Sequence, residues 1–272
     1  MRARGREERN RSPHLLRVAQ THRPQTSLGF AIALLRSRLK GRRILVVGSA
    51  PDPALPDPSD FDAVVCVNAS GDVARRRLGL SADLTVMDRE MTTLNGPGEK
   101  REAAFNLVRP LDLGLVVTVA SNAAQLNSSS LAALRNEGHV SLTRRQTRRA
   151  LQRAASDRRL NSSIDALVST GFSAMALAAL GRPKTIWLAG FRLFVPAGSH
   201  GTPHDYPMPR IDKVSPYRQD RSDGRKHSLA DAALLSGLAL SGLDVRSHEI
   251  ELAPLLSNRG SRGRASRRYG RS

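Results

Sequence analysis

Short apolar runs recur along this chain, and polar or amphipathic stretches separate them. Three such runs occupy residues 44–47, 63–67 and 84–87, and two more lie at residues 113–119 and 185–191. Mainly apolar runs of strand length are typical of strands that are covered on both faces of a sheet. Their alternation with helix-like stretches predicts an α/β domain with a mostly parallel sheet and helices on both faces.

The intervening stretches carry weaker signals of helices and further strands. Residues 28–35 are apolar but much shorter than the roughly 20 residues of a membrane-spanning helix, so we expect a packed or surface helix there. The remaining predicted elements are helices at 123–136, 146–158 and 229–243, an extra strand at 139–142, a last strand at 244–250 and a closing apolar turn at 252–256.

Residues 169–191 combine a loop, a helix and a buried strand. Ser169 and Thr170 can cap the helix by accepting a backbone N–H, and Gly171 would let this turn approach a ligand closely. The free N–H groups at the start of a helix bind anions readily, so the cap is a candidate ligand site. An ordinary capped helix that leads into a strand is the alternative, because helix caps use these residue types everywhere.

Small or polar residues follow the predicted strands, at the positions where an open parallel sheet binds ligands. Gly48 and Ser49 follow the first strand, Asn68 follows the second and Asp88 follows the third. Because the carboxyl ends of parallel strands lie on one edge, we expect these residues to converge there with the cap at 169–171. The chain has neither the glycine pattern of dinucleotide-binding folds nor the lysine of a phosphate-binding loop.

Residues 192–226 form a long stretch without periodicity that contains five prolines and three glycines. A connection of this length inside a compact domain is usually a lid or a binding loop. It ends at His227, which we place at the junction with the next helix, where an imidazole could take a proton near neutral pH. A surface or capping role is the alternative for His227. His200 and His204 have no third ligand nearby, so we expect no metal site.

The net charge of +19 is concentrated at the two ends of the chain. Residues 1–43 carry +10 and residues 258–272 carry +6, which leaves +3 for the central region. A nucleic-acid-binding domain more often carries its positive charge on the fold itself, so we expect no specific nucleic-acid partner. The basic ends could contact an anionic membrane peripherally, or they could be solvated tails.

The single cysteine, Cys66, lies in an apolar run. It excludes a disulfide within one chain, which favours a reducing, cytoplasmic compartment and a core position for the thiol. We divide the chain into a basic, partly disordered segment with a short helix at 1–41, an α/β domain at 42–257 with a lid at about 192–226, and an Arg-rich disordered tail at 258–272.

Three stretches of the chain, 42–88, 169–194 and 227–256, together resemble the sialyltransferases of the bacterial lipooligosaccharide type and, more distantly, the animal type. Ile-Leu-Val-Val-Gly-Ser-Ala-Pro from residue 44, with Phe-Asp-Ala-Val-Val-Cys-Val-Asn from residue 61, is similar to the family's large motif. Ser-Thr-Gly from residue 169, with the strand ending Ala-Gly-Phe, is similar to its small motif. His227-Ser228, with the closing Ile-Glu-Leu-Ala-Pro, is similar to the final segment of the bacterial members.

The resemblance implies a Rossmann-like glycosyltransferase domain that binds a CMP-sugar and needs neither a metal nor another cofactor. By position, Gly48, Ser49, Asn68 and Asp88 would contact the donor or the acceptor. The nucleotide would be held by Ser169, Thr170 and Gly171. His227 would be the general base that deprotonates a hydroxyl of a glycan or lipid-linked glycan acceptor, with inversion at the anomeric carbon.

The chain departs from the family pattern at several positions of this expected nucleotide-sugar site. Ser49 begins Ser-Ala-Pro-Asp where the bacterial pattern has Asn-Gly-Pro-Ser, Arg192 stands where that pattern has an acidic residue, and Phe194 replaces a tyrosine that contacts the leaving phosphate. Three other hypotheses therefore stay open: an inactive relative, a pterin pyrophosphokinase-like enzyme that uses ATP and Mg²⁺, and a basic adaptor that binds surfaces.

Overall fold

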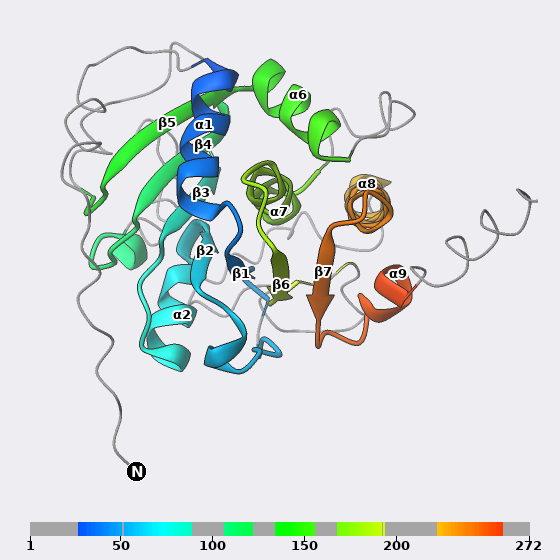
Figure 1. The fold of residues 1–272 in the computed structure, drawn as a ribbon, viewed down its shortest axis with the longest axis horizontal. Coiled ribbons are helices and arrows are strands. Elements are labelled where there is room, and N and C mark those ends of the chain that lie inside the picture. The colour runs from blue at the N-terminus through cyan, green and yellow to red at the C-terminus, as the bar shows by residue number, and fades with distance from the viewer. Residues whose placement is uncertain are drawn as a thin grey trace, which may run out of the picture.

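The computed structural model describes residues 27–50, 52–88, 106–121, 134–155, 168–191, 193 and 222–257. Its strands are β1 (Arg43–Val47), β2 (Ala63–Val67), β3 (Leu84–Asp88), β4 (Leu115–Ser121), β5 (Gly138–Thr143), β6 (Thr185–Ala189) and β7 (Asp244–Ser247). They form one sheet of order β5-β4-β3-β2-β1-β6-β7, in which all neighbouring strands are parallel (Figure 1). The predicted α/β fold with a parallel, Rossmann-like sheet is confirmed.

Helices connect and cover these strands. They are α1 (Leu28–Leu39), α2 (Gly71–Leu78), α6 (Arg144–Ala155), α7 (Thr170–Leu180), α8 (Ser222–Leu240) and α9 (Ala253–Ser257), with short 3-10 turns η2 (Pro58–Asp60) and η3 (Asn68–Ser70). Helix α1 lies in the predicted N-terminal segment, and five of its side chains are buried against the main core. The Oγ of Ser27 caps it by accepting the N–H of Phe30 at 3.2 Å.

Alternate side chains of the strands belong to two different cores, so helices cover both faces of the sheet. Ile44 and Val46 of β1 pack in the core that includes α1, α6, α7 and α8. Leu45 and Val47 of the same strand pack in a second core with Val73 of α2. This alternation is what a strand buried on both faces requires, because successive side chains point to opposite sides.

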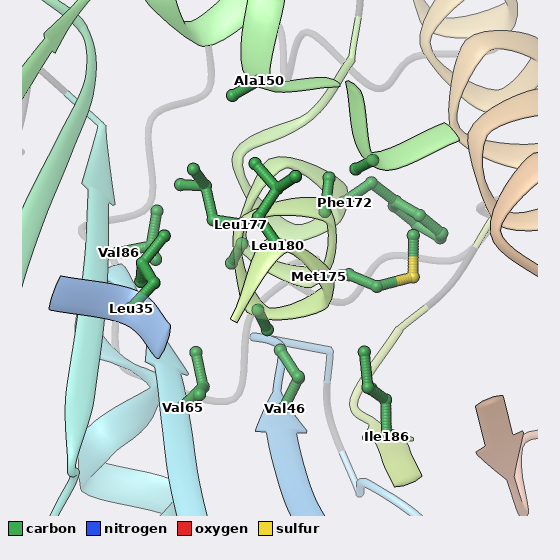
Figure 2. Packing of buried hydrophobic residues seen from close by; sticks show 14 of the residues in the cluster. Leu35, Val46, Val65, Val86, Ala150, Phe172, Met175, Leu177, Leu180 and Ile186 are labelled. Atoms are coloured by element: carbon green, nitrogen blue, oxygen red, sulfur yellow. The ribbon is translucent and has the colours of Figure 1, made fainter. Parts of the chain in front are cut away.

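Helix α7 lies at the centre of the larger core. It contacts α1, α6 and α8 as well as β1, β2, β3 and β6. In Figure 2, Met175 and Leu177 of α7 lie between Ala150 of α6 and the strand side chains of Val46 and Val65. A helix that is apolar nearly all round is typically buried in this way, and α7 is therefore a fixed platform for the residues at its N-terminus.

Several element boundaries differ from the sequence prediction. Strand β4 starts at Leu115 and not at 113, because Gly114 has a φ of +58° and interrupts the extended backbone. Helix α8 starts at Ser222, seven residues before the predicted 229. The prediction missed this start because residues 222–228 contain no apolar side chain that would reveal a helical period. The last strand ends at Ser247, and the closing segment is the short helix α9.

Some predictions fall on residues outside the described ranges. Most of the predicted helix at 123–136 does so, and its described end, 134–136, is not helical. The predicted lid is described only at residue 193 and at 222–226, where it is already part of α8. Residues 1–26 and 258–272 also lie outside. Within the described ranges, the helices are all too short or too polar to cross a bilayer.

Candidate functional site

The ends of β2 and β3 meet the start of α7 through two hydrogen bonds. Asn68 follows β2 with a left-handed backbone (φ 51°), which asparagine tolerates better than most residues, and its Oδ1 accepts the N–H of Asp88 at 2.8 Å. Asp88 is the last residue of β3, and its Oδ2 accepts the hydroxyl of Thr170 at 3.3 Å. These contacts confirm that the strand ends and the helix cap converge on one edge of the sheet.

The N-terminus of α7 leaves two backbone donors available. The Oγ of Ser169 accepts the N–H of Phe172 at 3.4 Å, so Ser169 is the predicted cap. The N–H of Ser169 is bound to Oδ1 of Asp231 at 2.9 Å. The N–H groups of Thr170 and Gly171 have no partner among the described residues. Two such donors at the positive end of a helix dipole favour an anion.

Asp231 of α8 fixes this cap by accepting the N–H of Ser169. This role of Asp231 was not predicted from the sequence. Its side chain is only 5% exposed. Burial raises the pKa of the carboxyl to about 7, and the hydrogen bonds from Ser169 oppose that rise. The sequence does contain a signal, since Asp231 is the only charged residue in the otherwise apolar stretch 229–235. A lone acid in an apolar helical stretch must find a polar partner when it is buried.

Strands β1 and β6 are neighbours at the point where the order of strands along the sheet reverses. The chain adds β2 to β5 on one side and β7 on the other, which makes this the topological switch point of the sheet. The pairing continues beyond both strands, because the N–H of Gly48 reaches the carbonyl oxygen of Ala189 at 2.8 Å and the N–H of Ala50 reaches that of Gly190 at 3.0 Å.

Gly48 has a packing role at this switch point, where the turns after β1 and β6 meet. A Cβ at position 48 would lie 2.2 Å from the carbonyl oxygen of Gly190, and real Cβ atoms do not approach so closely. Gly48 is buried, while the next residue, Ser49, is half-buried. The glycine therefore shapes the site by letting two turns touch, and its predicted contact with a donor or an acceptor stays a prediction.

Gly171 also has a packing role that the sequence did not reveal. A Cβ at position 171 would lie 3.2 Å from Cε1 of Phe191. Phe191 packs edge-on against Phe172, with ring centroids 5.2 Å apart and an interplanar angle of 81°. The sequence interpretation assigned this glycine to the close approach of a ligand, whereas here the neighbouring aromatic ring needs the space.

The segment after β7 stabilises the switch point through hydrogen bonds to the turns that follow β1 and β6. Oε1 of Glu249 accepts the N–H of Gly190 at 2.7 Å and the N–H of Ala54 at 3.2 Å. Oε2 of Glu251 accepts the N–H of Leu193 at 3.1 Å. One carboxylate thus ties together the turns that follow β1 and β6. Sequence reasoning missed Glu249, because nothing in its local pattern indicates partners about 60 and 195 residues away.

His227 does not stand at a loop-to-helix junction, and this part of the prediction is wrong. It is the sixth residue of α8, which begins at Ser222. Its position is four residues before Asp231, and residues four apart lie on the same face of a helix. Residue 227 therefore lies one turn from the carboxylate that holds the cap of α7.

The remaining predicted residues either lie outside the described ranges or have a structural role. Arg192 and Phe194 lie outside the described residues, as do His200 and His204. Cys66 is fully buried, and burial raises the pKa of its thiol to about 12, so the predicted core position is confirmed. Among the described residues, no group of three or more His, Cys, Asp or Glu side chains could hold a metal ion.

Comparisons of the chain with protein-family models, with curated proteins and with solved structures find no match.

Proposed function

We propose that this chain is an inverting, metal-independent glycosyltransferase that moves a sugar from a CMP-sugar donor to a glycan or lipid-linked glycan acceptor. The reaction would take place on the cytoplasmic side. In this proposal Ser169, Thr170 and Gly171 hold the nucleotide, and His227 is the general base. Gly48, Ser49, Asn68 and Asp88 border the donor and the acceptor. Arg192 and Phe194 would complete the donor side.

One observation carries the proposal: the three stretches of sequence that resemble sialyltransferases contact one another at a single edge of the sheet. Asp88 of the first stretch accepts a hydrogen bond from Thr170 of the second. Ser169 of the second donates to Asp231 of the third. Glu249 of the third accepts the N–H of Gly190 in the second. Ligands of open parallel sheets bind at this kind of edge.

The arrangement of donors suits a phosphate leaving group. The N–H groups of Thr170 and Gly171 can stabilise the negative charge that develops on the phosphate of CMP as its bond to the sugar breaks. The hydroxyl proton of Thr170 is engaged by Asp88, so this hydroxyl is positioned and is not the phosphate donor. Because the carboxylate of Asp88 would repel a phosphate, we assign it to hydroxyl or amino groups of the ligands.

The transfer step balances with one base and no oxidant or reductant. His227 takes the proton of an acceptor hydroxyl. The resulting oxygen nucleophile forms a bond to the anomeric carbon from the face opposite the phosphate. The bond between that carbon and the phosphate oxygen breaks, and its electron pair leaves with CMP. The position of residue 227 in α8 supports this role, because it stands one helical turn before Asp231, the residue that holds the nucleotide cap.

The first test is calorimetric titration of the purified protein with CMP, ADP and ATP, with and without Mg²⁺. We expect CMP to bind equally well with and without the metal. Binding of ATP that requires Mg²⁺, without binding of CMP, would contradict the proposal and support the pyrophosphokinase-like alternative. Binding of none of the three would leave an inactive relative as the better explanation.

The second test addresses the base. His227→Ala should lower turnover of an accepted CMP-sugar by about 10²- to 10⁴-fold, while the Kd for CMP changes little. His248→Ala is a matched control, because His248 is an exposed histidine that stacks on Trp187 at a ring distance of 5.0 Å. We expect this control to keep normal turnover. Near-normal turnover of His227→Ala would show that another group takes the proton.

A further inference from the structure

Helix α6 presents an unusual concentration of positive charge on its exposed side. Its buried residues are Thr147, Ala150, Leu151, Ala154 and Ala155, and the last four belong to the main core. Its exposed residues are all arginines, namely Arg144, Arg145, Arg148, Arg149 and Arg153. No acidic residue occurs anywhere in this helix. We call the five exposed residues the α6 arginine face.

This pattern works against the stability of the helix itself. Arg144 and Arg145 lie in the first turn, where the positive end of the helix dipole disfavours cations. Three pairs of arginines are four residues apart, and like charges at that spacing repel each other. A surface that only had to be soluble would mix acidic and basic residues. A local cost without a compensating gain in the fold indicates a role outside the fold.

Several arginines on other elements are paired with carboxylates. Examples are Arg43 with Asp62 at 2.8 Å and Arg76 with Asp72 at 2.7 Å. By contrast, four members of the α6 arginine face, Arg144, Arg145, Arg149 and Arg153, form no ion pair with any residue that the structure describes. Within the described part of the chain, their guanidinium groups are therefore not engaged by a carboxylate.

We propose that the α6 arginine face docks the protein on an anionic phospholipid surface. Arginine binds phosphate oxygens through two parallel N–H donors, and lipid headgroups offer phosphates in a plane. The central region of the chain carries a charge of only +3, whereas nucleic-acid-binding domains usually carry their positive charge on the fold. Helix α6 also has no aromatic side chain on which unpaired bases could stack. The inference does not depend on the proposed reaction.

The test is co-sedimentation of the full chain with vesicles of phosphatidylcholine, with and without phosphatidylserine at about a third of the lipid. The first variant replaces Arg144, Arg145, Arg149 and Arg153 by Gln, which has a similar helix propensity. A matched control removes the same charge from another exposed region and replaces Arg36, Lys40, Arg182 and Lys184 by Gln. Both proteins keep the basic residues at 1–26 and 258–272, so a difference between them reports the position of the charge.

Each basic residue near an anionic membrane contributes roughly fivefold in partitioning, equivalent to about 1 kcal/mol. We expect the α6 variant to lose binding to the anionic vesicles by about 100-fold or more, and the control by less than about tenfold. The α6 variant should unfold at the same urea concentration as the unmodified chain or a higher one, because like-charge repulsion is relieved. This comparison separates a loss of binding from a loss of folding.

Three results would overturn the proposal. Equal losses in the two variants would show that only net charge matters. Unchanged vesicle binding of the α6 variant would remove the role of this face. Binding of a 20-base-pair duplex that the α6 variant loses, combined with vesicle binding that it keeps, would assign the face to a nucleic acid.

Discussion

The buried carboxyl of Asp231 should make the stability of this protein depend on pH in a direction opposite to that of most carboxylates. We propose to replace it by asparagine. Asp231→Asn keeps a side-chain oxygen that can accept the N–H of Ser169, now bound at 2.9 Å, and it removes the ionisable group. The substitution is nearly isosteric, so it leaves no cavity in the contact between α7 and α8.

The magnitude follows from the pKa of the group in the two states. Burial raises the pKa of Asp231 from 3.8 to about 7 in the folded chain. Between these values the folded protein binds more protons than the unfolded one, so stability falls as pH rises. The full penalty, reached above pH 7, is about 4 kcal/mol, and about 3 kcal/mol of it develops between pH 5 and pH 8.

The variant loses this penalty but has a cost of its own. The amide N–H₂ of the asparagine is a donor that the carboxylate did not have, and a buried donor without a partner costs about 1–3 kcal/mol. We therefore expect Asp231→Asn to be about as stable as the unmodified chain, or less stable, at pH 5. At pH 8 it should be more stable by about 2 kcal/mol. The sign of the difference should change between these pH values.

Urea unfolding at pH 5, 6, 7 and 8 measures this difference. Fluorescence of Trp187 is a suitable signal, since it is the only tryptophan in the chain and is 8% exposed. Asp112→Asn is a matched control, because Asp112 is exposed and its change should stay within about 0.5 kcal/mol at every pH. The reasoning is refuted if Asp231→Asn loses stability equally at pH 5 and pH 8. That result would mean that a cation keeps this carboxylate charged.

Two further predictions concern the switch point. Gly48→Ala should lower the free energy of unfolding by about 2–3 kcal/mol, because the new Cβ would lie 2.2 Å from the carbonyl oxygen of Gly190. Gly29→Ala in α1, where the nearest atom is 4.0 Å away, should be neutral or stabilising in the same urea titration, and equal losses would contradict the packing role. Glu249→Ala should cost about 2 kcal/mol and Glu249→Gln about half of that, since only glutamine keeps an acceptor for the two backbone N–H groups. Equal losses for the alanine and glutamine variants would show that the charge, and not the acceptor, is needed.

The sheet could be predicted from the sequence because strands that are buried on both faces appear as short, continuous apolar runs. The run at 63–67 matches β2 at both ends, and the runs at 44–47 and 84–87 match β1 and β3 to within one residue. A helix was also predicted at 146–158, and α6 occupies Arg144–Ala155; its arginines and buried residues alternate with a helical period. The start of α8 shows no such period, because residues 222–228 carry no apolar side chain.

The candidate site was only partly predictable, for a different physical reason. Asn68, Asp88 and Ser169 stand at element ends, and the rule that strand ends share an edge is enough to bring them together. The residues that hold the site in place act over long separations in the sequence. Asp231 reaches a backbone N–H 62 residues away, and Glu249 reaches one 195 residues away. No periodicity or motif encodes such a partner, so these residues emerge only when the chain is folded.

The contacts between strand ends and the contacts made by the C-terminal segment differ in how strongly they support the proposed function. Any parallel sheet brings the ends of its strands to one edge, so the bond between Asn68 and Asp88 would be unsurprising in an unrelated α/β protein. Sheet topology does not require the C-terminal segment to hold both the cap of α7 and the turn after β6. Asp231 and Glu249 do so from inside the third stretch that resembles sialyltransferases. A resemblance spread by chance along the chain would have no reason to assemble in this way, and these two hydrogen bonds are therefore its strongest physical support.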